Sequence, residues 1–492
     1  MAEYLFRIPS EWNLDPYHAN SVHIVGLDGI PWPCRVSVSA TSADGEDKSD
    51  QPRILTVTRN QDESGRLYVL YDFDQLGEHL ICTGTLLPNN DEPYDLLIEL
   101  ARGTLNRMRN QTSIWEEGGL VVEESTRQKI QDATSHLGNA LFCVGQETSD
   151  QFASKTLATT IAAIYELANT FSKQISKFRR ERDELPQFWI ANQIGNSDQF
   201  EPSTTLSFSQ LATAKLKLES NDELCTATQS QLESLDKKVI VGPLLDASIG
   251  GFSESMLQLD DFLARKDRLI SDAEQTLQSL PKNTAMLRVA SGLNGTGHRN
   301  LSYPQQLQAT VDLLQLVEDS DVDVPTMVSF DFPWAERLAG AVGGTHPLQI
   351  ADSLIRQGVE LSFLGLEINL DLWPSGSTIR DPLQWIDLVD IWAQLGLPMV
   401  LCLRAPCGGI AETKGAETRN QTCSNLNDQQ RIDFLKTALT MMVARPSVHG
   451  LIFQQWQDAD DLRYPNSGIV GADGTPKEIF SVLETVNQAS GA

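Results

Sequence analysis

The strongest constraint on the fold is an alternation of short apolar segments with longer amphipathic ones, which begins near residue 186 and continues to the end of the chain. Each apolar segment has the length of a β-strand, and most of the intervening segments are long enough for a covering helix. An alternation of this kind predicts a parallel sheet with helices packed on it. The strand candidates are residues 188–193, 239–245, 286–292, 326–331, 361–369, 398–403 and 449–456.

The number of strand candidates separates two parallel folds. Seven are visible, which fits an eight-stranded barrel with one strand missed within residues 198–235. A doubly wound open sheet is the alternative, but no glycine-rich phosphate loop follows any of these segments. We therefore predict an α/β fold built on a (β/α)8 TIM-type barrel.

Two further regions precede the barrel, which we assign to residues 186–492. Residues 1–92 contain short β-branched or alternating runs separated by turn signals such as Asp28-Gly29, and they predict a small β-rich domain. Residues 93–185 have leucines at helical spacing and predict a helical connector packed on the barrel. The β-rich domain has two open interpretations, a sugar-binding module and a structural cap on the next domain.

Charge and cysteine content limit the possible partners. The 492-residue chain has a net charge of −28, which repels phosphate backbones and anionic lipid, so we expect neither a nucleic acid nor a membrane as partner. The N-terminus has no apolar stretch of signal-peptide length, and the seven cysteines are scattered without metal-ligand spacing. We expect a reduced, cytoplasmic protein that needs no cofactor and no metal. The oligomeric state stays open.

Polar and aromatic residues collect where the strand candidates end, which is where barrels of this class carry their sites. Such residues suit a sugar, because its hydroxyl groups accept and donate hydrogen bonds and its C–H faces stack on tryptophan. The candidates for substrate binding are Asn294, Asp331, Trp334, Asn369, Asp371, Arg404, Gln455, Trp456 and Asp458, and the candidates for catalysis are Glu367, Asp246 and Glu336.

Glu367 is the most distinctive of these residues. It lies in a strand whose leucines and isoleucine alternate with Gly365, Glu367 and Asn369, so the polar set is expected to face the barrel interior near its mouth. Burial there would favour the protonated carboxyl that a general acid requires. The alternative is a structural ion pair with Arg404, which has the inward parity on the next strand.

The end of the chain resembles a known family. A strand that finishes at Trp456 and Asp458 is followed by a glycine-containing loop, an Asp473-Gly474 turn and a helix start. This order resembles the last strand and helix of the family-ten glycoside hydrolases, the xylanase-like barrels, and the resemblance covers residues from about 186 to 487. The whole chain is also similar to uncharacterised family-ten-like proteins of planctomycete type. The resemblance implies a barrel, a carbohydrate partner and hydrolase chemistry.

Both glutamates that the family uses are replaced. The segment that resembles the fourth strand has Gly292 where the family has its acid/base, and the segment from Gly396 to Arg404 has Leu403 where the family has its nucleophile. Asp246 stands at the end of the segment that resembles the third strand, where xylanases have a Trp-His pair. No catalytic role can therefore be carried over from the family, although Trp456 and Asp458 match its final motif.

Two hypotheses about function remain. In the first, the protein hydrolyses O-glycosidic bonds with a rebuilt carboxylate pair, in which Glu367 is the acid or nucleophile and Asp246, Glu336 or Asp331 is its partner. In the second, it is a pseudoenzyme, a catalytically inactive barrel that binds a glycan or another protein. They differ in whether Glu367 is free in the cleft or held in an ion pair.

Overall fold

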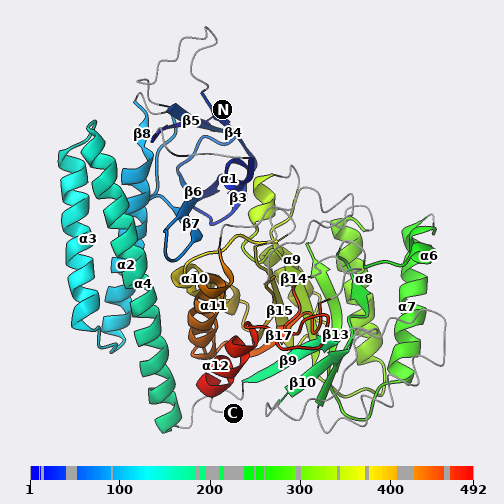
Figure 1. Ribbon diagram of the computed structural model, residues 1–492. Coiled ribbons are helices and arrows are strands. Elements are labelled where there is room, and N and C mark those ends of the chain that lie inside the picture. Colours follow the sequence, from blue (N-terminus) through cyan, green and yellow to red (C-terminus); the bar gives the residue numbers. More distant parts are fainter. Residues whose placement is uncertain are drawn as a thin grey trace.

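The computed structural model describes residues 2–9, 12, 16–39, 53–89, 92–182, 188–194, 210–214, 238–248, 251–259, 261–294, 301–340, 344–371, 376–406, 426–458 and 466–490. Along the chain, a β-sandwich is followed by three long helices and then by a barrel. The sandwich lies above the barrel, and the three helices form a layer along one side of it (Figure 1).

The N-terminal β-sandwich contains two four-stranded sheets within the described residues, in the orders β4-β5-β1-β8 and β3-β2-β6-β7. Its core forms because alternate side chains of each strand face inward, as in β1, where Tyr4, Phe6 and Ile8 are buried. The elements are β1 (Ala2–Ile8), α1 (Pro16–Ser21), β2 (His23–Gly26), β3 (Pro31–Trp32), β4 (Cys34–Val38), β5 (Arg53–Arg59), β6 (Gly65–Asp72), β7 (Glu78–Cys82) and β8 (Tyr94–Asp95).

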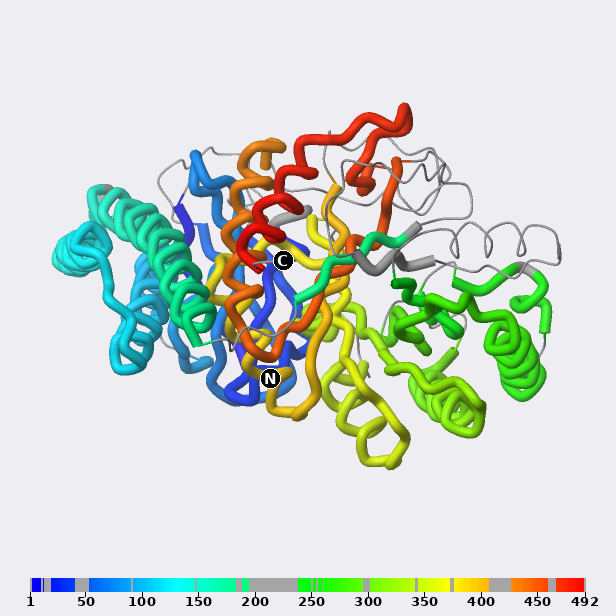
Figure 2. The backbone as a smooth tube through the Cα atoms, turned by 90° about the horizontal axis from the view of Figure 1, so that it is seen from below, coloured from blue at the N-terminus to red at the C-terminus, as the bar shows by residue number. Residues whose placement is uncertain are grey.

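Three helices follow directly, α2 (Leu96–Glu117), α3 (Glu124–Phe142) and α4 (Glu147–Arg182). The first begins at Asp95, whose side chain accepts a hydrogen bond from the backbone N–H of Ile98 at 3.3 Å. The three helices pack on one another, and α4 also packs on the barrel helices α10 (Pro382–Ala393) and α11 (Asp428–Val443). Seen from below, this layer and helices α7 (Phe262–Gln278) and α8 (Tyr303–Glu318) lie on opposite sides of the barrel (Figure 2).

The barrel prediction is confirmed. Eight parallel strands of the described chain pair in a closed ring, because β17 pairs with β9 and β11 pairs with β13. This closure rules out the open-sheet alternative, and the strand expected within residues 198–235 is β10. The strands are β9 (Trp189–Ile194), β10 (Gln210–Ala214), β11 (Lys238–Val241), β13 (Thr284–Leu293), β14 (Thr326–Asp331), β15 (Phe363–Asn369), β16 (Met399–Arg404) and β17 (Val448–Phe453), and the two-residue β12 (Leu245–Asp246) continues the line of β11.

Helices cover the outer face of the barrel after most strands. Besides α7, α8, α10 and α11, the described covering helices are α6 (Glu254–Leu257), α9 (Pro347–Arg356) and α12 (Phe480–Ser490). The 3-10 helix η1 (Glu336–Ala339) packs against the sandwich instead. The interior of the barrel has a separate apolar cluster near the amino-terminal ends of the strands, with Ile240, Met286, Met327, Val400 and Ile452. The lower half of the barrel is therefore a packed core, and a site can form only above it.

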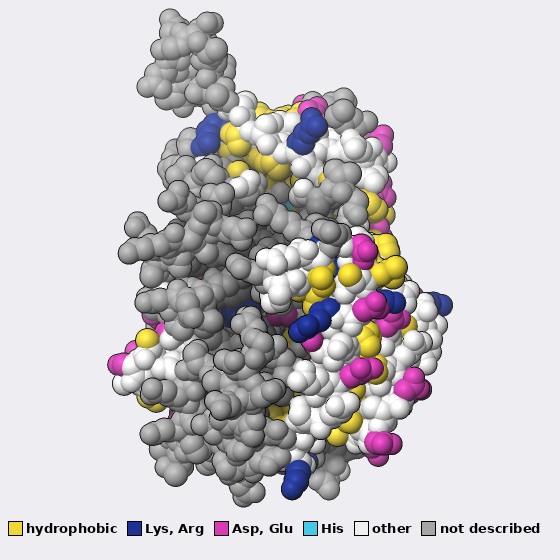
Figure 3. Space-filling view, turned by 90° about the vertical axis from the view of Figure 1, so that its right-hand side faces the viewer, with side chains coloured by type: hydrophobic (Ala, Val, Ile, Leu, Met, Phe, Trp, Pro, Cys, Tyr) yellow, Lys and Arg dark blue, Asp and Glu magenta, His cyan; other side chains and the backbone are white. Residues whose placement is uncertain are grey.

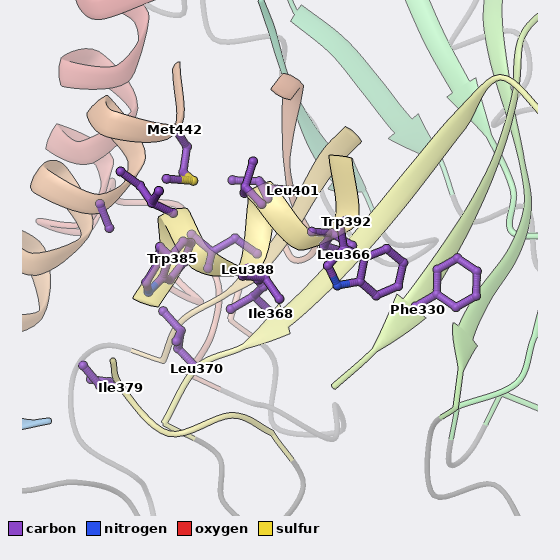
Figure 4. Close-up of a cluster of buried hydrophobic side chains, with 14 of the residues drawn as sticks. Phe330, Leu366, Ile368, Leu370, Ile379, Trp385, Leu388, Trp392, Leu401 and Met442 are labelled. Atoms are coloured by element: carbon purple, nitrogen blue, oxygen red, sulfur yellow. The ribbon is translucent and has the colours of Figure 1, made fainter. Parts of the chain in front are cut away.

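Helix α10 is buried far more than a surface helix. Trp385 and Trp392 are both 0% exposed, because one side of the helix faces the sheet and the other meets α4 and α11. Figure 4 shows Trp392 beside Phe330 of β14, and Trp385 toward α11. Asp381 caps the helix by accepting hydrogen bonds from the backbone N–H groups of Leu383 and Gln384.

The sandwich is joined to the barrel by backbone and side-chain bonds. The N–H of Leu80 on β7 donates to the carbonyl of Ile379 at 2.7 Å, and the side chain of Gln384 donates to the carbonyl of Leu80 at 2.6 Å. Arg107 of α2 forms a bidentate ion pair with Asp381. The three parts of the molecule therefore share buried polar contacts.

No helix in the described part of the chain is long and apolar enough to cross a membrane. On the face drawn in Figure 3, the described acidic and basic side chains lie among one another. The described acidic side chains on that face are therefore not gathered into a single patch.

Candidate functional site

Above the apolar core, the barrel interior contains a layer of buried polar side chains. Arg288 of β13, Ser329 of β14, Glu367 of β15 and Gln454 just after β17 are each between 0% and 5% exposed. The predicted parity of β15 is confirmed, because its apolar side chains pack outward against the helices and Glu367 bonds to side chains of the interior. This layer is the floor of the barrel mouth.

The carboxylate of Glu367 is the centre of the layer. Its Oε1 accepts hydrogen bonds from Arg288 Nη2 at 2.7 Å, from the backbone N–H of Gly292 at 2.7 Å and from Ser329 Oγ at 2.6 Å. The expected alternative of a structural ion pair is found with a different cation, since the partner is Arg288 and not Arg404. Arg288 also donates to Ser329 Oγ at 2.9 Å, so the three side chains form one connected network.

Gly292 enters this network through its backbone. Strand β13 has register shifts on either side of Ala290, and these release the N–H of Gly292 to reach Glu367. Gly292 has a φ of +64°, and a Cβ at this position would lie 2.7 Å from the backbone nitrogen of Ser248. Position 292 therefore has neither the space nor the backbone conformation for a side chain.

Asp246 lies beside the same network. Its Oδ1 accepts from the backbone N–H of Ser248 at 3.1 Å and from Ser248 Oγ at 2.5 Å. Burial by itself lowers the pKa of the Arg288 guanidinium, but the neighbouring Cys402, Glu367 and Asp246 raise it above its ordinary value. Two predicted catalytic carboxylates, Glu367 and Asp246, are thus brought near one arginine.

A second set of predicted residues lies one step closer to the strand ends. Arg404 Nη1 donates to Asn369 Oδ1 at 2.8 Å, and Asn369 Nδ2 donates to Asp331 Oδ1 at 3.0 Å. The backbone N–H of Phe332 donates to the same oxygen at 2.9 Å. Guanidinium, carboxamide and carboxylate groups from three neighbouring strands therefore stand in a row at the mouth.

Cys402 is the thiol of this interior. It is 0% exposed, and burial raises its pKa to about 12, with the charge of Glu367 acting in the same direction and Arg288 against it. The thiol therefore stays protonated and unreactive at neutral pH. Among the described residues no group of three or more His, Cys, Asp or Glu side chains could hold a metal ion.

Glu336 and Trp334 do not lie at the mouth. The chain turns away after β14, through left-handed backbone at Phe332 and Ala335, and η1 contacts β2 and β3 of the sandwich. Glu336 is fully buried there and pairs with Arg380 at 3.2 Å, while Arg380 lies 5.1 Å from the ring centroid of Trp334. Contrary to the prediction, Glu336 therefore does not belong to a carboxylate pair at the barrel mouth.

Four other predicted residues are used in local contacts. Asp371 is fully buried against Arg431 of α11 at 2.6 Å, and Asp458 binds Lys477 at 2.9 Å. Trp456 is only 6% exposed, so it offers little surface for a sugar ring, and Gln455 donates to the carbonyl of Gln457 at 3.2 Å.

Asn294 ends β13 in left-handed backbone. Its N–H donates to Gln306 at 3.3 Å, and Arg337 Nη1 donates to its carbonyl oxygen at 3.3 Å. Its Nδ2 is buried without a hydrogen-bond partner among the described residues.

Sequence reasoning missed Arg288, Ser329 and Gln454. Arg288 had a usable signal, because an arginine inside the otherwise apolar segment Met286 to Ala290 must face a buried partner. Ser329 and Gln454 had none, since a serine or glutamine in a strand is compatible with either face. Their role became visible only when the strands were placed side by side.

The chain matches no protein-family model and no curated protein. Solved structures with a similar arrangement are xylanases. Xylanase 10B from Thermotoga maritima is 11% identical, with 63% of this chain and 98% of that chain covered and a TM-score of 0.44. The endo-1,4-beta-xylanase from Caldicellulosiruptor owensensis is 9% identical, covering 64% and 99%, also with a TM-score of 0.44. A psychrophilic family-ten endo-beta-1,4-xylanase is 10% identical, covering 64% and 98%, with a TM-score of 0.45. At identities this low the likeness concerns the fold.

Proposed function

We propose that the barrel binds a carbohydrate at its mouth and does not hydrolyse it. The observation that carries the proposal is the saturation of Glu367 Oε1 by three donors, one of them the guanidinium of Arg288. Because all three groups donate to Oε1, this oxygen has no proton of its own directed at a leaving group. Glu367 is therefore a structural anchor for the barrel interior and not a general acid.

The other two candidate catalytic carboxylates do not supply the missing acid. Glu336 is enclosed at the interface with the sandwich and paired with Arg380. Asp246 is bound through Oδ1 to Ser248, and Gly292 leaves no room for a replacement glutamate on β13. Hydrolysis with Glu367, Asp246 and Glu336 alone would therefore lack a positioned proton donor.

Support for a carbohydrate partner comes from the groups in the row at the mouth. Arg404, Asn369 and Asp331 present donors and acceptors within one hydrogen-bonded chain, a combination that suits the vicinal hydroxyl groups of a sugar. Arg404 is the half-buried member, so it is the group of this row that a ligand reaches first. The sequence resemblance to the family-ten barrels favours the same class of ligand.

The test compares binding and cleavage in one preparation. The wild type, Arg404→Ala and Glu367→Gln are each incubated with xylans, β-glucans and aryl glycosides. Binding is measured by affinity electrophoresis, and cleavage is measured by reducing-sugar release. We expect retention of at least one polysaccharide, about tenfold weaker in Arg404→Ala because charged hydrogen bonds are lost, and no sugar release. Absence of retention on the whole panel would refute carbohydrate binding.

One observation favours hydrolysis as a second candidate. No described residue hydrogen-bonds to Glu367 Oε2, and Asp331 is the register partner of Glu367 on the adjacent strand. Neighbouring strands are about 4.8 Å apart, close to the separation of roughly 5–5.5 Å between the carboxyl groups of retaining enzymes. In this case Glu367 would be the nucleophile and Asp331 the acid. Sugar release that disappears in Glu367→Gln would establish it and overturn the non-hydrolytic proposal.

A further inference from the structure

A cavity of about 670 Å³ lies where the sandwich, helix α2 and the barrel meet, away from the barrel mouth. Its walls come from β2, β6 and β7 of the sandwich, from α2, and from the segment after β14 together with α10. Cavities of roughly 300–1,000 Å³ are of the size that holds small molecules. None of the candidate residues of the mouth except Trp334 lines it.

The wall contributed by α2 presents carboxamides that the protein itself does not use. Asn106, Asn110 and Gln111 are accessible, and none of them hydrogen-bonds to another described residue. Asn106 and Asn110 are four residues apart and therefore lie on one face of the helix, and all three carboxamide residues line the cavity. Each carboxamide offers both a donor and an acceptor.

Two histidines line the cavity in defined tautomers. His23 donates from Nδ1 to the carbonyl of Ser21 at 2.8 Å, so its Nε2 is a bare acceptor. His346 accepts at Nδ1 from the N–H of Leu348 at 3.1 Å, so its Nε2 carries the proton and is a donor. Burial lowers the pKa of each ring to about 4, and both are therefore uncharged at neutral pH.

The accessible charged groups of the cavity are one cation and three carboxylates. Asp28 and Asp390 line it together with Arg66 and Asp387, and Asp390 is paired with Arg445 outside the cavity wall. Arg66 and Asp387 are exposed on its walls, and neither forms an ion pair with a described residue. Arg107 and Arg380, which also line it, are neutralised by Asp381 and Glu336. The exposed aliphatic side chains of Leu27, Ile114 and Ile391 complete the wall.

We propose that this cavity binds a small, uncharged, polyhydroxylated ligand, a mono- or disaccharide. Hydroxyl groups both donate and accept, which matches the unused carboxamides and the two opposite tautomers. The C–H faces of a sugar ring match the accessible aliphatic side chains. An anionic ligand would face Asp28 and Asp387 as well as Arg66, and a volume of about 670 Å³ suits a small molecule better than an extended peptide. This site is independent of the proposed function at the barrel mouth.

The test uses the full chain with D-glucose, D-xylose, D-galactose, cellobiose, xylobiose and maltose as probes, followed by saturation-transfer NMR and calorimetry. Four proteins are compared: the wild type, the cavity variant Asn106→Ala/Asn110→Ala, the mouth variant Arg404→Ala and the control Asn139→Ala. Asn139 is an exposed asparagine on α3, outside both sites. Alanine at exposed helical positions favours folding, so loss of binding cannot be attributed to unfolding.

We expect at least one sugar to bind, about tenfold more weakly in the cavity variant and equally well in Arg404→Ala and the control. Binding that weakens only in Arg404→Ala would place the sugar at the mouth, refuting the cavity site while supporting the proposed function. Failure of all six sugars to bind would refute the cavity site. Weakening by more than a factor of about two in the control would show a nonspecific effect and would equally count against the assignment.

Discussion

Two regions of this protein bury an arginine against a carboxylate, and they do so with different surroundings. In the barrel interior, Ser329 forms hydrogen bonds with both Arg288 and Glu367. The three residues lie on three different strands of one parallel sheet. At the junction of sandwich and barrel, Arg107 of α2 meets Asp381, which is 274 residues away in sequence. The first pair therefore braces a single unit, and the second connects units that lie far apart along the chain.

The two regions also differ in how many polar groups they leave unused. In the barrel interior, Glu367 Oε1 takes three donors and Arg404, Asn369 and Asp331 bond to one another. In the junction cavity, Asn106 and Asn110 have no described partner. The three donors on buried Glu367 therefore indicate a structural role, whereas the accessible asparagines of the cavity, and the half-buried Arg404 at the mouth, present groups that a ligand can reach.

The largest expected effect is at the barrel interior. Arg288→Met removes the cation and leaves the Glu367 carboxylate unpaired at 5% exposure. Breaking one partner of a buried pair costs about 3–5 kcal/mol of unfolding free energy, measured by urea denaturation. The double variant Arg288→Met/Glu367→Gln removes the uncompensated charge and is expected to recover most of the loss. An unchanged midpoint in the single variant would contradict the structural role of the pair.

The junction pair is expected to contribute somewhat less. Arg107→Ala leaves the fully buried Asp381 carboxylate without its cation. Because the Arg107 side chain is 15% exposed, we expect the unfolding free energy to fall by about 3 kcal/mol at most. Arg109→Ala is the matched control, because Arg109 is an exposed residue of the same helix. Equal losses in both variants would mean that the pair does not hold the junction together.

This contribution should depend on pH. Burial alone raises the pKa of Asp381, but the charge and hydrogen bonds of Arg107, together with a hydrogen bond from Gln384, outweigh it and hold the pKa below the ordinary 3.8. A lowered folded-state pKa stabilises the fold above pH 3.8, and this stabilisation is lost as the pH falls through the lowered value. The difference between wild type and Arg107→Ala in urea should therefore shrink between about pH 5 and pH 2. A constant difference would exclude this linkage.

A smaller effect is expected at Gly292 of β13. Gly292→Ala forces a Cβ against Ser248 in left-handed backbone, so we expect a loss of about 2–3 kcal/mol in thermal or urea denaturation. Gly358→Ala is the control, since Gly358 has a φ of +74° and no atom lies within 4 Å of the place its Cβ would take. The unfolding free energy of Gly358→Ala should fall by only about 1 kcal/mol. Equal losses would show that the contact with Ser248 is not restrictive.

The smallest effect is expected in the cavity. Arg66→Met removes an exposed cation with no ion pair among the described residues, so stability should change by less than about 0.5 kcal/mol in the same urea titration. A loss of unfolding free energy comparable to that of Arg107→Ala would mean that the cavity wall is structural. The cavity would then not differ from the barrel interior in leaving polar groups available for a ligand.

Much of the architecture was predictable because strands and helices have different hydrophobic periods. The alternation after residue 186, the missing strand within residues 198–235 and the inward parity of Glu367 all follow from local pattern. The partner of Glu367 did not follow, because Arg404 and Arg288 have the same inward parity and only the placement of β13 beside β14 decides between them.

Residue order thus determined which segments become strands and which of their side chains face inward, since both depend on neighbours a few positions apart. Tertiary structure decided which inward groups meet. It turned Glu336 and Trp334 away from the mouth toward the sandwich, and it placed residues of α2 and of α10 on the walls of one cavity. The physical reason is that burial and pairing energies depend on distances in space between residues remote in sequence, which no local period encodes.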